Sequence, residues 1–326
     1  MSWPLLLFVR FVVGLFEAAS FPSMTAVNSR WIPRSEFARA QAISLAGTTA
    51  GPIFAYPLTT WIITSYSWEV VFYAFGALGL VWVGAWWWYA TDRPQEHRAV
   101  GAQELELIQR EKVFRRGKAV SFGELLKCRS VLFLALAYFF CLYSGALFLF
   151  WLPSYLVKAR GFTVSAMGWV GVIPMVSGLL GAIAGGIISD ALLRRSANPE
   201  RARRIVPILG GTSGAVVICL AVLASSPWLS VALLSVYLFF FSGAVSGFWS
   251  MPFELHHEAT GSISSVMNLG GNLGAMIGPW VGGYLIRTTG SWVIPFYTVG
   301  AMMLVMVLIL LFLLRLRPIT SPLKSV

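Results

Sequence analysis

The sequence predicts an all-helical integral membrane protein built from two related helical bundles, and three observations support this prediction. Hydrophobic residues make up 57% of the 326 residues and charged residues only 11%, whereas a soluble domain would carry about 25% charge. Apolar stretches of about 20 residues, long enough to cross a hydrocarbon layer ~30 Å thick, follow one another along nearly the whole chain. The third observation is a sequence repeat of long period.

The repeat joins residues 67–77, SWEVVFYAFGA, to residues 291–301, SWVIPFYTVGA, with six identities at a constant offset of 224. Three residues just upstream recur at an offset of 227: Gly47, Gly51 and Pro52 return as Gly274, Gly278 and Pro279. Self-similarity over such a distance in an apolar chain is typical of membrane transporters made of two related halves.

Nine apolar segments are expected to span the membrane. They lie at about 5–27, 39–63, 70–90, 131–157, 166–192, 205–224, 228–250, 264–286 and 292–314. The segments near 131–158, 166–192 and 205–224 have no counterpart upstream. If the two halves are of equal length, the counterparts would need about 90 residues before Met1, so we expect the three opening helices of a twelve-helix design to be missing.

The one long polar connection divides the chain into three parts. Residues 1–90 are expected to be the remainder of an N-terminal bundle with three spans. Residues 91–130 form a predicted cytoplasmic linker with a short surface helix at about 102–113. Residues 131–326 form a predicted six-helix bundle with a short tail.

The net charge of +11 follows the topology of the membrane segments. Twenty of the 24 Lys and Arg fall on alternate connections and the C-terminus, and only Lys158, Arg160 and Arg287 fall on the opposite side. This positive-inside bias predicts that the basic loops and the C-terminus are cytoplasmic and that Met1 is outside. The basic surplus is therefore not a nucleic-acid site. Compact loops favour a bacterial inner (plasma) membrane, and a eukaryotic organelle is the alternative.

Arg10 and Glu17 are the charged residues inside the first predicted span. A charge near the bilayer centre costs at least ~2.5–3.5 kcal/mol on insertion scales, so such residues are functional candidates. Seven residues are almost two helical turns, which places both on one face, about 10 Å apart along the axis. The Arg10 fork suits a substrate carboxylate, and a partly desolvated Glu17 suits proton coupling. The alternative is structural pairing with another helix.

Other polar and aromatic residues within the spans are candidates for substrate binding. Asn268 and Asn272 share a helix face and could read the hydroxyls of a polar solute or join helices by hydrogen bonds. Tyr143, Trp151 and Trp249 could line a cavity, although aromatic residues at helical spacing are more often core.

A candidate gating motif closes the fifth apolar segment. Gly186 and Asp190 are followed by Arg194 and Arg195, and an Asp at a helix end with Arg on the next turn can form a charge lock at the cytoplasmic face. Glycines at four-residue spacing, including Gly270 to Gly282 and the pair Gly181 and Gly185, predict close helix packing.

Metal and cofactor chemistry is not indicated. Glu254, His256, His257 and Glu258 lack the HExxH spacing, and we interpret them as a solvated turn. Three cysteines have neither disulfide nor metal spacing: Cys128, Cys141 and Cys219. We expect no metal, no cofactor and no enzymatic activity.

Four stretches resemble the anion:cation symporter family of the major facilitator superfamily. Residues 10–43, RFVVGLFEAASFPSMTAVNSRWIPRSEFARAQAI, are similar to its fourth helix and following loop, and 185–195, GGIISDALLRR, to the superfamily's loop signature. Residues 151–156, WLPSYL, and 268–285, NLGGNLGAMIGPWVGGYL, resemble its seventh and eleventh helices. The chain would then correspond to helices four to twelve.

The resemblance implies alternating-access transport of an organic anion, such as a sugar acid, coupled to protons. It further implies that Arg10 contacts the carboxylate, that Glu17 joins the proton relay and that Asn268 contributes to the sugar-acid site. Sodium remains a second possible coupling ion. A rival hypothesis is a non-transporting membrane protein, either a truncated isoform or a scaffold.

Overall fold

The computed structural model describes residues 3–110, 122–257 and 259–316, and the regular elements of this part of the chain are all helices. Four helices precede the linker: α1 (Trp3–Glu17), α2 (Ser20–Trp31), α3 (Phe37–Ser65) and α4 (Trp68–Tyr89). Six long helices follow it: α7 (Arg129–Lys158), α9 (Val172–Arg195), α10 (Pro199–Leu223), α11 (Pro227–Phe248), α13 (Thr260–Thr289) and α14 (Ile294–Leu308). Short helices connect them: η1 (Arg34–Glu36), η2 (Pro94–Glu96), α5 (Ala102–Arg110), α6 (Phe122–Leu125), α8 (Val164–Val170) and α12 (Met251–Leu255), with the π-helical turn η3 (Ile309–Leu313) ending α14.

Seven stretches of the described chain are long and apolar enough to cross a membrane, and α1 and α2 together form one of them. Helices α3 and α13, with 29 and 30 residues, are also long enough to cross a membrane, but their Gly, Ser and Thr residues lower their mean hydropathy. The multi-pass prediction is confirmed, whereas the count of nine spans stays a prediction.

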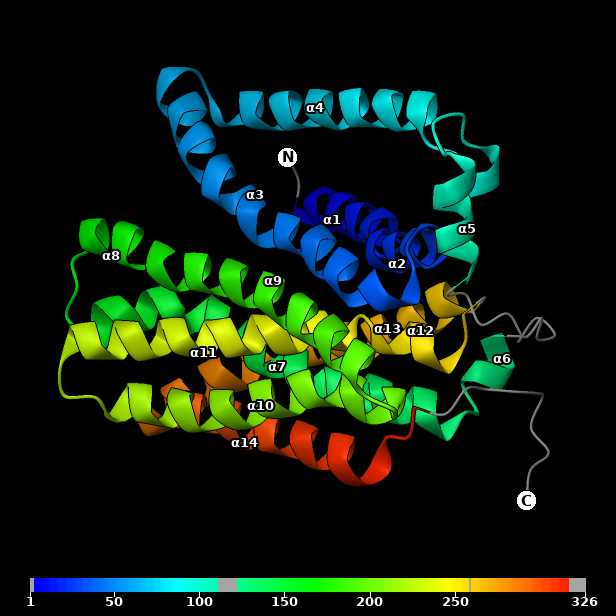
Figure 1. Ribbon diagram of the computed structural model, residues 1–326. Coiled ribbons are helices and arrows are strands. Elements are labelled where there is room, and N and C mark those ends of the chain that lie inside the picture. Colours follow the sequence, from blue (N-terminus) through cyan, green and yellow to red (C-terminus); the bar gives the residue numbers. More distant parts are fainter. Residues whose placement is uncertain (1–2, 111–121, 258, 317–326) are drawn as a thin grey trace.

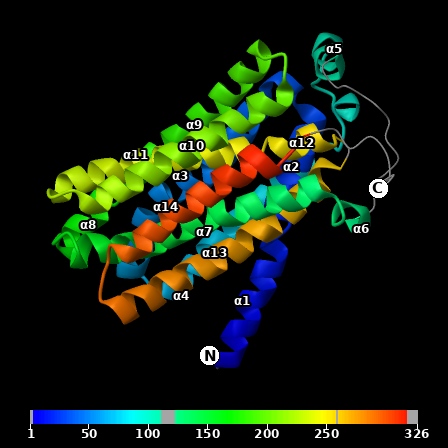
Figure 2. The ribbon, with the colours of Figure 1, turned by 90° about the horizontal axis from the view of Figure 1, so that it is seen from below.

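The helices from α7 to α14 form one tightly packed bundle (Figures 1 and 2). Its glycines lie at helix crossings, as their spacing predicts. A Cβ added at Gly270 would lie 2.5 Å from the carbonyl oxygen of Ala135, and one added at Gly278 would lie 2.5 Å from that of Tyr143. Both carbonyls belong to α7, so the backbones of α7 and α13 lie close together at these glycines.

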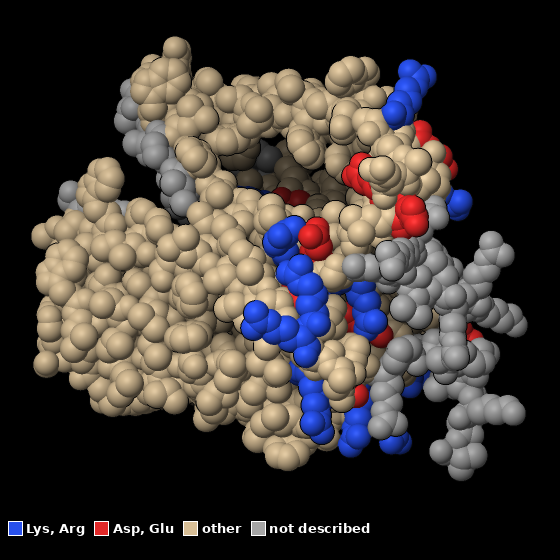
Figure 3. All heavy atoms as spheres, viewed as in Figure 1, with Lys and Arg blue, Asp and Glu red and all other residues tan. Residues whose placement is uncertain are grey.

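The N-terminal helices are covered unevenly by the rest of the described chain. The first part of α3 packs against α9, with Phe37, Ala38 and Ala42 fully buried. Further along, Phe54 is 75% exposed, and α3 diverges from the large bundle toward α4 (Figure 1). Helices α1 and α4 bury no residue, and the surface is hollowed between α4 and α1 to α3 (Figure 3).

The linker contains the predicted surface helix. Helix α5 begins at Ala102, as expected, and runs to Arg110. The remainder of the prediction, to residue 113, lies outside the described residues.

Candidate functional site

Arg10 and Glu17 both lie on α1 and are exposed. Neither has a hydrogen bond or ion pair with another described residue. Their separation of seven residues places them on nearly the same helix face. They therefore present a guanidinium and a carboxylate that the described part of the chain leaves available.

The two asparagines on α13 differ in exposure. Asn268 is 7% exposed, whereas Asn272, one turn later, is exposed. Tyr143 is 5% exposed, and its hydroxyl lies 3.4 Å from Thr298 Oγ1 on α14. Tyr143 thus lies within the helix packing of the C-terminal bundle, and Asn272 is the accessible polar group of the three.

Trp249 lies where the N-terminal helices meet the C-terminal bundle. It follows α11 directly and is 1% exposed. Its Nε1 donates to the hydroxyl of Tyr138 on α7 at 2.8 Å, and its ring lies 5.5 Å from that of Phe21 on α2. Trp249 is therefore part of the contact between the two halves. It does not line an open surface.

Asp190 joins α9 to the beginning of α3. Its Oδ1 accepts from the backbone N–H of Ala38 at 3.1 Å, and its Oδ2 accepts from that of Arg39 at 2.6 Å. These N–H groups belong to the first turn of α3, where helical N–H groups lack partners within the helix and the helix dipole favours a negative charge. A carboxylate from one half thus caps a helix of the other.

Arg203 on α10 provides the cation for Asp190. Its Nη1 lies 2.7 Å from Asp190 Oδ1, its Nε donates to Glu254 Oε1 at 3.2 Å, and its Nη2 donates to the carbonyl of Arg34 at 2.9 Å. Arg34 in turn pairs with Glu254 on α12. Arg203 is fully buried, and the side chains of Asp190 and Glu254 are 1% and 4% exposed. We call these four residues, Arg34, Asp190, Arg203 and Glu254, the charge lock.

The charge lock corrects two expectations from the sequence. Arg194 and Arg195 are exposed and form no ion pair with Asp190, whose cationic partner among the described residues is Arg203. Glu254 is buried in ion pairs, so the solvated-turn interpretation of its cluster is wrong for this residue. No group of three or more metal-binding side chains occurs in the described chain.

The lock lies at the basic end of the molecule, which we define by the arginines at the end of α9 and the start of α10. Lys and Arg gather over these elements on the face shown in Figure 3. Small residues allow a close approach of the halves at this end. A Cβ added at Gly186 would lie 2.7 Å from the carbonyl oxygen of Ala38, and one added at Gly261 would lie 2.9 Å from the Cβ of Ala26. Both leave no room for a side chain.

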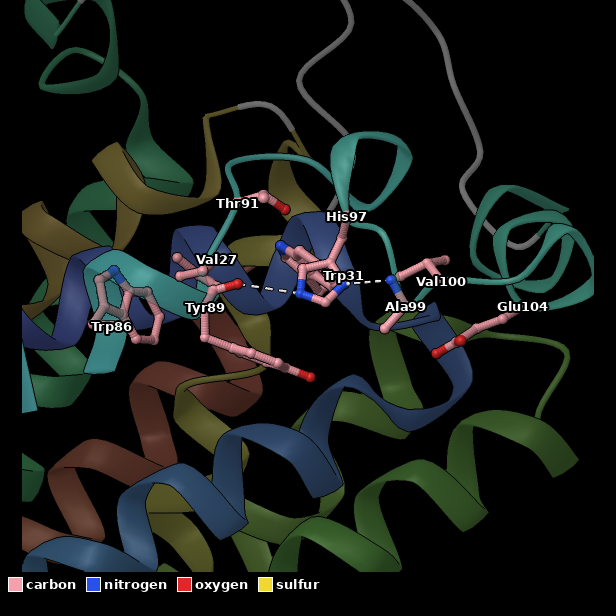
Figure 4. A pocket seen from close by; sticks show the side chains of 10 residues that line it. Val27, Trp31, Trp86, Tyr89, Thr91, His97, Ala99, Val100 and Glu104 are labelled. Atoms are coloured by element: carbon pink, nitrogen blue, oxygen red, sulfur yellow. Dashed lines mark hydrogen bonds between the residues drawn. The ribbon is translucent and has the colours of Figure 1, made fainter. Parts of the chain in front are cut away.

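A separate cavity of about 370 Å³ lies between the ends of α2 and α4 and the linker (Figure 4). Trp31, Trp86 and His97 line it, with Glu104 at the other end from Trp86. His97 Nδ1 accepts from the N–H of Ala99 at 3.2 Å, so Nε2 carries the proton and donates to the carbonyl of Tyr89. The ring is thereby held by hydrogen bonds to its neighbours, and Glu104 is the acidic residue among the described residues of the lining.

Comparison with known proteins gives consistent results. The sequence pattern described as Major Facilitator Superfamily matches residues 1–274. The chain is 31% identical to the "Probable sulfoacetate transporter SauU" of Cupriavidus necator over 98% of its own length and 74% of the relative's. It is 30% identical to the "Probable galactarate/D-glucarate transporter GudP" of Escherichia coli, over 92% of its own length and 69% of the relative's.

Among solved structures, the fold matches that of the proton:xylose symporter XylE. The TM-score is 0.60 at 13% identity, with 90% of this chain and 67% of that chain covered. At this identity the likeness concerns the fold alone.

Proposed function

The chain belongs to the major facilitator superfamily, within its anion and sugar-acid transporters, and on that premise we propose that it moves an organic anion across the membrane together with a proton. It is a multi-pass membrane transporter and not an enzyme. The relatives named above are described as transporters of sulfoacetate and of galactarate or glucarate. These solutes share an acidic group on a small polar skeleton, which is the substrate class we propose.

The charge lock carries the proposal of alternating access. In that mechanism the two bundles close the path at one end while it is open at the other. The lock joins α3 to α9, α10 and α12 at the basic end, while α3 diverges from α9 toward the other end (Figure 1). This arrangement supports a state closed at the basic end.

The membrane orientation follows from the charge distribution. We assign the basic end and the C-terminus to the cytoplasm of a bacterial cell, with the protein in the inner membrane. We keep residues 1–90 as part of the N-terminal bundle, 91–130 as the linker and 131–326 as the C-terminal bundle, with nine spans in all.

Four residues form the proposed transport site. Arg10 binds the acidic group through paired charge-assisted hydrogen bonds. Glu17 loads and releases the coupled proton, and Asn268 and Asn272 orient substrate hydroxyls. The support for Arg10 and Glu17 is their exposure without a polar partner among the described residues.

Uptake by purified protein in proteoliposomes tests the function. Radiolabelled galactarate, a hexuronate and sulfoacetate are offered with an inward proton gradient, with a sodium gradient or with neither. We expect saturable uptake of at least one anion, accelerated by the proton gradient. Acceleration by sodium alone would replace the proton as the coupling ion. No uptake under any gradient would favour the alternative of a non-transporting protein. The relatives, which are described as transporters, speak against that alternative.

The Arg10→Lys variant tests the binding role. A point charge replaces the two-pronged fork, so we expect the KM for the anion to rise about tenfold or more. Arg195→Lys, at an exposed position outside the proposed site, is the matched control and should leave KM unchanged. A wild-type KM in Arg10→Lys would remove Arg10 from the site.

A further inference from the structure

A chain of buried neutral hydrogen bonds crosses from the N-terminal helices to the C-terminal bundle beside the charge lock. Gln41 on α3 is fully buried, and its Nε2 donates to the carbonyl oxygen of Trp249 at 3.2 Å. Its Oε1 accepts from Asn28 Nδ2 on α2 at 2.7 Å. On the other side, the Trp249 indole donates to Tyr138 on α7. Within this series of hydrogen bonds, the one from Gln41 to the Trp249 carbonyl joins the two halves.

The backbone at Trp249 is interrupted where this bond is made. Helix α11 ends at Phe248 and α12 begins at Met251, with Pro252 in its first turn. Because Pro252 has no N–H, it cannot donate to the carbonyl four residues earlier, and the regular ladder cannot pass through this point. The N–H of Ser250 instead bonds to the carbonyl of Gly247 at 3.2 Å. The Trp249 carbonyl lies at this break and accepts its bond from the other half.

The Trp249 ring extends the contact toward the proposed proton site. It is 1% exposed and packs against Phe21 of α2, with the ring centroids 5.5 Å apart. Glu17 ends α1 and Phe21 lies in the first turn of α2, with Ala18 and Ala19 between the two helices. The group that we propose to carry the proton thus lies four residues before Phe21 in the sequence, at the end of the preceding helix.

From these contacts we infer that Gln41 and Trp249 form the inner closure of the transport path, a neutral contact separate from the charge lock. This inference rests on the proposed function, since a closure requires a path that opens. For the halves to part at the basic end, the Gln41 to Trp249 bond breaks and the indole loses its cover by Phe21. No charge is desolvated or exposed in that step, whereas opening the charge lock separates buried ions. Gln41 is therefore a positioning residue, which holds the closed state without touching the anion.

The Gln41→Glu variant tests the closure directly. A carboxylate still accepts from Asn28 but cannot donate to the Trp249 carbonyl, which it repels instead. Asn28→Ala is the matched control, because it removes the bond within the N-terminal helices, adds no acceptor that would compete for Gln41 Nε2, and leaves the bond between the halves. Gln41→Met has a similar volume, removes both bonds without adding a charge, and decides the matter if the Glu variant does not fold.

The measurement is the distance between spin labels at Trp88→Cys and Arg195→Cys, two exposed positions on α4 and α9, with the natural cysteines replaced. It is made in lipid without substrate or gradient. For Gln41→Glu and Gln41→Met we expect the fraction of long distances to rise several-fold, and for Asn28→Ala we expect the parent distribution. Parent distributions in folded, monodisperse Gln41→Met would overturn the inference. Because no substrate is present, this result is independent of the uptake assay, and an absence of uptake would instead refute the proposed function.

Discussion

The hairpins α3–α4 and α13–α14 carry the same sequence echo but are packed very differently. Phe72 on α4 is 66% exposed, whereas its counterpart Phe296 on α14 is 1% exposed. The ring of Phe296 lies 4.7 Å from that of Tyr155 on α7. The shared local sequence specifies the same helix in both places, but burial depends on the neighbours that each helix finds. Helix α14 finds α7 and α10, and α4 finds no comparable cover among the described residues.

The largest expected effect on stability concerns the attachment of α3 to the C-terminal bundle, which depends on the charge lock as well as on packing. Arg203→Ala leaves Asp190 and Glu254 buried without their shared cation, and breaking a buried ion pair on one side costs about 3–5 kcal/mol. We expect the unfolding temperature in detergent to fall by many degrees. Arg195→Ala, an exposed arginine nearby, should change it little. Equal effects of the two variants would show that the charge lock does not hold the halves together.

The echoed phenylalanines sharpen the comparison between the hairpins. Phe296→Ala opens a cavity between α7 and α14 and should cost about 3 kcal/mol, near the low end for buried Phe→Ala changes. Phe72→Ala removes an exposed ring and should cost well under about 1 kcal/mol. The check is denaturant unfolding of both variants in the same lipid mixture. A similar loss in both would mean that α4 is covered in the functional protein as α14 is here.

The smallest expected effect uses the echoed glycines Gly278 and Gly51. A Cβ at Gly278 would lie 2.5 Å from the Tyr143 carbonyl, so Gly278→Ala should cost about 1–3 kcal/mol through overpacking. Nothing lies within 4 Å of a Cβ at Gly51, so Gly51→Ala should be neutral or add a few tenths to about 1 kcal/mol from helix propensity. Thermal unfolding of the pair measures the difference. Destabilisation by Gly51→Ala would show a helix crossing at that position in the working protein.

Much of the fold follows from local features of the sequence. Membrane spans are set by length and hydropathy, and the start of α5 at Ala102 follows from its helix-favouring composition. The glycine spacing on α13 correctly indicated close packing, since only Gly permits the approach to α7 that Gly270 and Gly278 make. These features depend on residues near one another in the chain.

The partners within the charge lock could not be identified in the same way. The sequence indicates a role for Asp190, but Arg203 lies 13 residues further on in a run with two other arginines, Arg201 and Arg204, and no spacing distinguishes it. Arg34 and Glu254 are 220 residues apart, and only the fold brings them together. One signal was available for Glu254: apolar Met251, Phe253 and Leu255 surround it, which is unusual for a solvated turn.

The charge lock has as many positive as negative groups: Arg34 and Arg203 balance Asp190 and Glu254. Moving one elementary charge across a membrane potential of 100 mV changes the free energy by about 2.3 kcal/mol. A neutral cluster that moves as a unit contributes almost nothing to this term. In the proposed cycle, the anion and the proton on Glu17 are the charges that would cross the membrane, so the transport current would report their stoichiometry.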